Sequence, residues 1–379
     1  WLKHNGDFVV RSRRPATLGV AFYPHLYETE FLVPILGKGT KLNAGKLGLG
    51  MDPVDFRNRA YFDGVVRILT KKSVPFDMAD ITMRSVSELL EYPTLVLLSN
   101  EIMDAATQTK LVQYVRRGGR LVVFPMLPKY DRDFGPCSIM TDAFGIKTRG
   151  RGASNRIYTD GLRDIPVPQL PWVISDKGAK VLARDVHGKV VGIEKKLGRG
   201  KVRFFGFFVN YTIEEHPSLW STMMQLPEVP RNVCADNDGL HLEARFADGE
   251  GVLFVGNFHR MPRTAHIVAR NPRGGAPLDI GRITVEALTG LFLPLEKRLS
   301  AGATLVYAYG ELLDRTAKGG RIRFGLCGHG NSAGRIVLRL KKKAAKITVD
   351  GKPVTATRQG DLLVVEYPQN GKRQIVEIR

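Results

Sequence analysis

Residues 94–125 read TLVLLSNEIMDAATQTKLVQYVRRGGRLVVFP, and this stretch decides the fold class. Its first apolar run, Thr94–Leu98, is typical of a strand buried on both faces, and Arg120–Phe124 is a second such run. Between them, Asp104 can cap an amphipathic helix, and Gly118 can adopt the positive φ that ends it. A strand, a helix and a strand in this order predict two parallel strands joined by a crossover helix.

The same alternation extends upstream of this stretch. Apolar spacing predicts strands at 18–23 and 78–82, a helix over 56–69 and a short helix over 85–90. Such alternation predicts an α/β domain over residues 17–228, with a parallel sheet and helices on both faces. The later part of this domain is more strand-like, with a hairpin-like pair at 189–196 and 200–209 and a helix at 218–225.

From about residue 230 the pattern changes to short runs in which apolar and polar residues alternate. This spacing predicts a β-sandwich over 229–315 and a small β domain over 316–379, in which Asp350–Gly351 is a hairpin signal. Residues 1–16 are expected to form a linker, with a strand at Phe8–Val10 that belongs to a preceding domain. Since the first residue is Trp1 and not Met, we expect that translation begins upstream.

Composition places the chain among ordinary globular proteins. Of the 379 residues, 43% are hydrophobic and 25% are charged, and no apolar run approaches the roughly 18 residues of a membrane-spanning helix. The three cysteines, Cys137, Cys234 and Cys327, lie far apart and lack C-x-x-C spacing. They predict free thiols in a reducing compartment, which favours the cytoplasm, and neither a disulfide scaffold nor a structural zinc site.

The charge balance is strongly basic, with 57 Lys and Arg against 37 Asp and Glu and a net charge of +20. A balance of this kind indicates a nucleic acid or an acidic protein as partner. The cations occur in twos and threes along the chain, and no nucleic-acid-binding motif accompanies them. We therefore favour an acidic protein partner. Nucleic-acid binding is the less favoured alternative, and a steep salt dependence of affinity would reveal it.

Two tests for catalytic chemistry in the α/β domain are negative. A dinucleotide site needs G-x-G-x-x-G after the first strand, where this chain has Tyr23–Pro24–His25, and no phosphate-binding loop occurs elsewhere. An amidotransferase or α/β-hydrolase needs its nucleophile on a glycine-flanked elbow, but Ser99–Asn100–Glu101 follows the strand at 94–98 without flanking glycines. We therefore expect no cofactor and no nucleophile elbow.

The remaining candidates for chemistry have structural interpretations. Cys137 lies beside a proline well past its strand, and His216 is interpreted as a surface histidine before a helix. Isolated acids such as Glu194, Glu243 and Glu286 are interpreted as solvated strand residues. The eight histidines form no metal-binding motif. The sequence thus predicts no catalytic residue and no metal ligand.

A long polar and glycine-rich loop follows the strand at 18–23. Tyr23, His25, Tyr27 and Glu28 come at the carboxyl end of that strand, where open α/β sheets present ligands or partners. Aromatic rings flanked by polar groups suit stacking on a sugar face, so these four residues are predicted as accessory substrate-binding residues. The alternative is that the loop packs against another domain.

Several short motifs, taken in order, resemble a known arrangement. They are Gly19–Tyr23, Val74–Asp77, Leu89–Val96, Tyr114–Val122, Gly198–Val202 followed by Phe205–Phe207, Leu253–Phe258 and Thr304–Leu312. Together they resemble the amidotransferase-like trimerisation domain of β-galactosidase-type glycoside hydrolases and the β-sandwich that accompanies it. The layout is most similar to that of archaeal β-galactosidase and exo-β-glucosaminidase relatives. The resemblance implies a flavodoxin- or amidotransferase-like parallel sheet followed by all-β sandwich domains.

The resemblance also has functional implications. In those enzymes a (β/α)8 barrel precedes this domain and carries both catalytic glutamates, whereas this sequence contains no barrel. There the α/β domain has lost amidotransferase chemistry, serves oligomerisation and lends residues to a neighbouring active site. The leading hypothesis is therefore a non-catalytic subunit or fragment of a heteromeric, oligomeric glycoside hydrolase. Its expected partners are an acidic barrel chain and a β-linked oligosaccharide. The alternative is a stand-alone carbohydrate-binding or assembly module.

Overall fold

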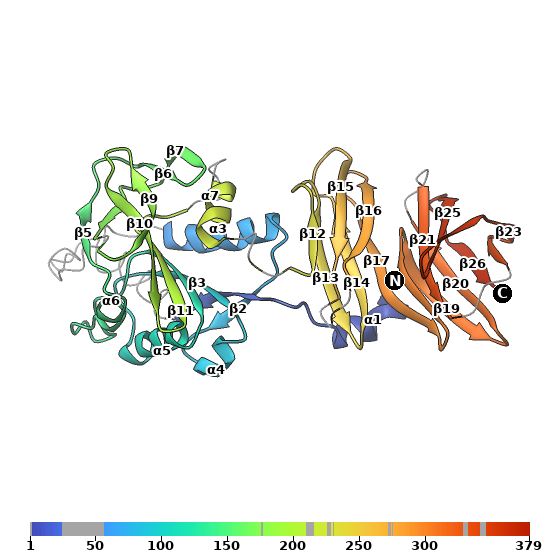
Figure 1. Cartoon of the computed structure of the whole chain (residues 1–379), viewed down its shortest axis with the longest axis horizontal. Helices are drawn as coiled ribbons and strands as arrows, with labels where there is room; N and C mark the ends of the chain where they lie inside the picture. Colours follow the sequence, from blue (N-terminus) through green and yellow to red (C-terminus); the bar gives the residue numbers. More distant parts are fainter. Residues whose placement is uncertain are drawn as a thin grey trace, which may run out of the picture. The chain divides into compact units, whose positions relative to one another are not determined.

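The computed structural model describes residues 2–24, 57–175, 177–209, 216–225, 229, 231–271, 274, 276–328, 333–341 and 346–379. The chain divides into two compact units. One unit comprises Ala16–Pro230, and the other combines Trp1–Pro15 with Arg231–Arg379. Figure 1 shows the helices and strands of both units. Among the helices described, none has the length and apolar character needed to cross a membrane.

The first unit contains the predicted run of parallel strands. These are β1 (Leu18–Phe22), β2 (Phe76–Asp80), β3 (Thr94–Ser99) and β4 (Arg120–Pro125), which lie in the order β2-β1-β3-β4. Leu18 lies opposite Phe76 on one side and Thr94 on the other. All six residues of β3 are buried, as expected for a central strand covered on both faces.

Within the described residues, five helices accompany this sheet: α3 (Arg57–Lys71), α4 (Val86–Leu89), α5 (Ala105–Arg116), α6 (Ile139–Phe144) and α7 (His216–Met224). Figure 1 shows α3 and α7 on one face and α4, α5 and α6 on the other. Local chemistry begins two of them. Ser85 and Glu88 form a capping box on α4, and the Asp104 side chain accepts a hydrogen bond from the Thr107 backbone N–H at the start of α5.

Beyond β4 the sheet continues with mixed pairing. The added strands are β11 (Gly200–Phe205), β10 (Val190–Leu197), β9 (Lys180–Asp185), β6 (Arg156–Thr159) and β7 (Leu162–Pro166). Only β11 pairs parallel, to β4, and the others pair antiparallel. A separate pair is formed by β5 (Thr148–Arg151) and β8 (Trp172–Ile174). The predicted parallel sheet is thus one half of a nine-stranded mixed sheet.

The hairpin between β10 and β11 requires glycine at two points. Gly198 has φ of 59°, in the left-handed region that favours glycine. A Cβ on Gly200 would lie 2.1 Å from the backbone oxygen of Val115, so only a residue without a side chain lets this turn approach α5. The Gly-Arg-Gly sequence therefore allows β11 to join the sheet beside β4.

The described residues of the second unit form three antiparallel sheets. A three-stranded sheet has the order β12 (Val233–Ala235), β15 (Arg263–Ala269) and β16 (Leu278–Val285). A seven-stranded sheet has the order β13 (His241–Ala247), β14 (Glu250–Gly256), β17 (Gly290–Ser300), β18 (Ala303–Ala308), β21 (Ala333–Leu340), β25 (Leu362–Pro368) and β24 (Ala356–Gln359). A five-stranded sheet has the order β19 (Glu311–Lys318), β20 (Arg321–Cys327), β26 (Gln374–Ile378), β22 (Ile347–Val349) and β23 (Lys352–Pro353). Because β18 pairs with β21, the seven-stranded sheet includes residues from both predicted β regions, 229–315 and 316–379.

The strand predicted at Phe8–Val10 is wrong, because these residues lie in the helix α1 (Leu2–Arg11). Phe8 is buried, and the Lys297 Nζ atom lies 3.4 Å from the centre of its ring. Just after the helix, Arg245 donates hydrogen bonds to the side chain and the carbonyl of Ser12. These contacts join α1 to residues more than 230 positions away in the sequence, so they outweigh the strand preference of two adjacent valines.

Candidate functional site

The carboxyl edge of the parallel strands contains the first of the four predicted sugar-contacting residues. Tyr23, directly after β1, is fully buried, and its hydroxyl donates a hydrogen bond to Asn100 Oδ1 at 3.3 Å. This packing leaves no ring face open in the part of the chain that is described. His25, Tyr27 and Glu28 lie outside the described residues. Accessory sugar binding by these four residues therefore stays a prediction.

At the end of β3, where an amidotransferase or hydrolase would carry its nucleophile, the chain has a closed polar turn. Asn100 Oδ1 accepts a hydrogen bond from the Ile102 backbone N–H at 2.9 Å, and the Ser99 hydroxyl donates to the Asn100 carbonyl. Ser99 and Asn100 are both buried. This serine donates its hydroxyl hydrogen to the backbone of its own turn, and no described residue acts on it as a general base.

The next residue, Glu101, is a buried acid that sequence reasoning passed over. Its side chain is only 2% exposed. One carboxyl oxygen lies 3.2 Å from Lys129 Nζ, and Oε2 has no hydrogen-bond partner among the described residues. Burial raises the pKa of Glu101 above its ordinary value, although Lys129 and Arg151 oppose the shift. The sequence signal that could have indicated this acid is the polar triplet Ser99–Asn100–Glu101 directly after an apolar strand.

Beside Glu101, two cationic side chains, Lys129 and Arg151, lie against the indole ring of Trp172. The Arg151 guanidinium lies 4.2 Å from the centre of the Trp172 ring, and Lys129 Nζ lies 5.4 Å from it. A carboxyl group with a raised pKa can act as a proton donor. Glycoside hydrolysis, however, needs a second carboxylate on the other side of the sugar, and Glu101 pairs with no other acid among the described residues. Within the described part of the chain, this cluster therefore supplies one carboxyl group.

Glu101→Gln is expected to flatten the pH dependence of stability of the unit Ala16–Pro230. Because the folded state raises the pKa of this carboxyl, the protonated form is the one that folding favours. The associated stability is present below the unfolded-state pKa and is lost as pH rises through the folded-state pKa. Urea midpoints at about pH 4 and about pH 7 measure this loss, which should be smaller in the variant, since glutamine does not titrate. The exposed-residue variant Glu91→Gln is the control, and equal losses in wild type and Glu101→Gln would contradict the prediction.

Two other sequence candidates are found in structural roles. Gln108 Nε2 donates to Cys137 Sγ at 3.3 Å, and burial raises the pKa of that thiol, the opposite of nucleophile activation. His216 was interpreted as a surface histidine, which is wrong. It is fully buried at the start of α7, and its Nε2 lies 2.8 Å from the Pro166 carbonyl oxygen. No group of three or more potential metal-ligating side chains occurs within the described ranges.

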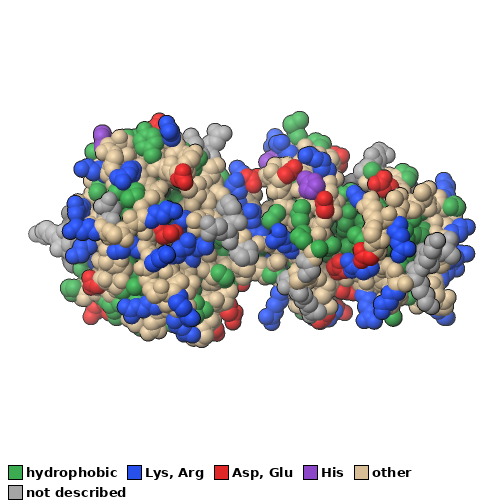
Figure 2. Space-filling view, in the orientation of Figure 1, with side chains coloured by type: hydrophobic (Ala, Val, Ile, Leu, Met, Phe, Trp, Pro, Cys, Tyr) green, Lys and Arg blue, Asp and Glu red, His purple; other side chains and the backbone are tan. Residues whose placement is uncertain are grey.

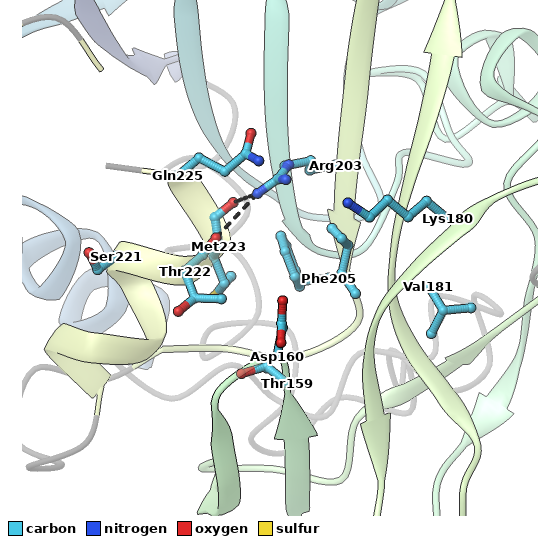
Figure 3. Close-up of a pocket in the computed structure, with 11 residues that line it drawn as sticks. Thr159, Asp160, Lys180, Val181, Arg203, Phe205, Ser221, Thr222, Met223 and Gln225 are labelled. Carbon is cyan, nitrogen blue, oxygen red and sulfur yellow. Dashed lines mark hydrogen bonds between the residues drawn. The ribbon is translucent and has the colours of Figure 1, made fainter. Parts of the chain in front are cut away.

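A pocket of about 470 Å³ lies on the face of the mixed sheet that α7 covers (Figure 3). Lys180 and Val181 line it from β9, Arg203 and Phe205 from β11, and Asp160 from the turn between β6 and β7. The far wall is the last turn of α7. None of these residues was predicted as a site. The pocket forms only when β6, β9, β10 and β11 pair, and no local sequence pattern specifies which of these strands lie side by side.

A buried ion pair supports one side of this pocket. The Arg203 side chain is 3% exposed and Glu194 is 14% exposed, and Arg203 Nε donates to Glu194 Oε2 at 2.6 Å. Arg203 Nη1 also donates to the carbonyls of Thr222 and Met223 at the end of α7, as the dashed lines in Figure 3 show. The interpretation of Glu194 as a solvated residue is therefore wrong. It holds the arginine that satisfies the C-terminal carbonyls of α7.

Comparisons with known proteins agree with the resemblance seen in the sequence. Residues 46–180 match the family described as GLMA-like, second domain. A β-1,2-glucosyltransferase of Ignavibacterium album is 28% identical over 257 residues, covering 68% of this chain and 36% of that protein. An exo-β-D-glucosaminidase of Thermococcus kodakarensis is 27% identical over 323 residues, covering 80% of this chain and 39% of that protein. The chain thus spans well under half the length of these relatives.

Solved structures give the same fold. A β-galactosidase from Bacillus circulans sp. alkalophilus superposes with a TM-score of 0.57 at 19% identity, covering 77% of this chain and 43% of that chain. A GH42 β-galactosidase from G. stearothermophilus gives a TM-score of 0.56 at 16% identity, covering 74% of this chain and 40% of that chain. At these identities the likeness concerns the fold alone. The relationship to glycosyl-processing enzymes rests on the sequence matches, and within it residues 46–180 correspond to a GLMA-like second domain.

Proposed function

We propose that the chain is a non-catalytic part of a β-galactosidase-like glycoside hydrolase that assembles with a (β/α)8 barrel. The observation that carries the proposal is the chemistry at the carboxyl edge of the sheet. Ser99 is bound within its own turn, and Glu101 has no carboxylate partner among the described residues. A hydrolytic site of the usual kind needs two carboxylates, so the reaction requires groups from elsewhere.

Two further observations support the proposal. The chain spans 36%, 31% and 39% of three glycosyl-processing relatives, which leaves room in such proteins for a separate catalytic part. The net charge of +20 suits an acidic partner. On the face shown in Figure 2, Lys and Arg side chains are dispersed over both units with fewer Asp and Glu between them. A dispersed cationic surface favours long-range attraction to an acidic protein over recognition of one narrow ligand.

In this assembly the carboxyl edge of the parallel strands is the surface that faces the sugar. His25, Tyr27 and Glu28, which follow the buried Tyr23, would contact a β-linked oligosaccharide bound mainly by the barrel. Assembly into a heteromeric oligomer, and a cytoplasmic location, are part of the same proposal.

The purified chain is expected to show no hydrolysis of aryl-β-galactosides or aryl-β-glucosaminides above the rate in buffer. The physical reason is that the described residues place no second carboxylate beside Glu101, and without a pair the glycosidic bond lacks either its acid or its nucleophile. The measurement is release of the aryl group in a preparation shown by mass to contain no other protein. Hydrolysis that scales with chain concentration and is lost in Glu101→Gln would contradict the proposal, because it would assign an active acid to this chain.

A further inference from the structure

Two of the charged side chains that line the pocket beneath α7 form no ion pair among the described residues. In the sheet register, Glu194 lies opposite Arg203 on β11 and opposite Lys180 on β9. Its carboxylate binds Arg203 at 2.6 Å and Lys201 at 3.3 Å. Burial alone would raise the pKa of Glu194, but the hydrogen bonds and charges of these two cations hold it below its usual value. Glu194 is thus fully engaged, and Lys180 is left out of the pair.

Lys180 is exposed and makes no ion pair with any residue in the described part of the chain. Asp160, in the turn from β6 to β7, is likewise exposed and unpaired among the described residues. Figure 3 shows the Lys180 side chain extending into the pocket from β9, with the Asp160 carboxylate directed into it from another side. Among the described residues, therefore, two side chains of opposite charge border one pocket without forming an ion pair. Both can interact with a bound ligand.

The net charge of the pocket favours an anion. Among the described residues that line it, two are cations, Lys180 and Arg203, and one is a carboxylate, Asp160. Behind the wall, Arg203 and Lys201 share the single negative charge of Glu194, at 2.6 and 3.3 Å. The local sum is one positive charge, on an already basic chain. A small anionic group close to Lys180 and Arg203 would complete the balance.

The rest of the lining suits a hydroxylated ligand. Thr159 Oγ1 is buried and has no hydrogen-bond partner among the described residues. Ser221 and Gln225 add a hydroxyl and an amide, while Val181 and Phe205 supply an apolar side. Sugars present hydroxyls at their edges and C–H groups on their faces, so a mixed polar and apolar wall matches them. The volume of about 470 Å³ accommodates one or two sugar rings.

We propose that this pocket binds a sugar of monosaccharide to disaccharide size that carries one anionic group, with the anion at Lys180 and Arg203 and the hydroxyls toward Asp160, Ser221 and Gln225. The site lies entirely within the unit Ala16–Pro230 and needs no barrel chain. Whether this pocket binds an anionic sugar is therefore independent of the assembly role proposed above.

The test is calorimetric titration of the whole chain with four probes: D-glucuronate, D-glucose 6-phosphate, D-glucose and D-glucosamine. At least one of the two acids is expected to bind at least tenfold more tightly than glucose or glucosamine. Preference for glucuronate identifies a carboxylate as the natural anion, and preference for the phosphate ester identifies a phosphate. Equal binding of glucose, tighter binding of glucosamine, or no binding of either acid would overturn the proposal.

Lys180→Met keeps the length of the side chain and removes its charge. Because Lys180 is exposed, the variant should fold like the parent chain, which a urea midpoint checks. Its Kd for the preferred acid should rise at least tenfold, with little change for glucose. The matched control is Lys189→Met, in the exposed turn between β9 and β10, which should leave every Kd unchanged. Equal effects of the two substitutions would show that net charge, and not this pocket, determines affinity.

Discussion

Trp220→Ala lowers the free energy of unfolding of the α/β unit by about 3–5 kcal/mol, the largest loss we expect from one side chain. Trp220 is the largest fully buried side chain of the described residues, and it lies on α7. Its ring packs against that of Phe124 in a T-shaped arrangement, with 5.2 Å between centroids and 83° between planes. Truncation removes this contact between helix and sheet and leaves a cavity the size of an indole.

The matched variant for this prediction is Trp220→Phe. The indole Nε1 is buried without a hydrogen-bond partner among the described residues, so the N–H itself adds no stability. Phenylalanine keeps an aromatic ring against Phe124 and removes that N–H, so it should lose far less than alanine. The measurement is urea unfolding followed by a signal from the α/β unit, because two units can unfold in separate transitions. Similar losses for alanine and phenylalanine would show that the ring contact is not what holds α7.

Glu194→Ala is the second substitution with a large expected effect. It leaves Arg203, whose side chain is 3% exposed, without its carboxylate. Removing one partner of a buried ion pair typically costs about 3–5 kcal/mol, because an uncompensated charge remains inside. The same change also releases Lys201, which lies 3.3 Å from the shared oxygen. We expect α7 to loosen and the pocket beneath it to lose its wall.

Two controls separate this buried pair from an ordinary surface pair. Asp164→Asn breaks the contact between Asp164 and Arg156, whose side chains are 52% and 47% exposed, and should leave the unfolding midpoint unchanged. The double variant Glu194→Leu with Arg203→Leu removes both buried charges and should recover much of the loss. If the single and double variants are equally unstable, the cost comes from lost packing or from the Thr222 and Met223 carbonyls that lose their donor, and not from the stranded charge.

The part of the fold that the sequence predicted is the part governed by local patterns. The buried strand Thr94–Ser99, the Asp104 cap and the glycine stop after α5 are each specified by a few adjacent residues. The antiparallel half of the sheet was not predicted beyond the hairpin at Gly198–Gly200. Its pairings join segments that turns and loops separate, and register between such segments depends on tertiary packing. The error at Phe8 has the same origin, since the Lys297 contact that buries it is 289 positions away.

The candidate site was predicted less completely than the fold. Tyr23 was predicted at the carboxyl edge but not in the core, where its ring lies. The local sequence around a tyrosine that follows a strand does not indicate whether its ring is buried or exposed. Glu101 was considered only as a position without an elbow, although its buried carboxyl is the main titratable group there. Glu194 resembled any polar strand residue, and only the register that sets it opposite Arg203 reveals its role. Burial and pairing partners are properties of the folded chain, and they decide which acids carry chemistry.

The central claim is that this chain works in an assembly whose catalytic carboxylates lie on a (β/α)8 barrel. Native mass spectrometry of the particle that contains this chain in its source cells, combined with peptide sequencing and an aryl-glycoside assay on the same fraction, tests it most directly. We predict one particle that contains these 379 residues together with a barrel sequence, and hydrolysis only in that fraction. A particle made of this chain without any barrel sequence, or hydrolysis in a barrel-free fraction, would contradict the claim.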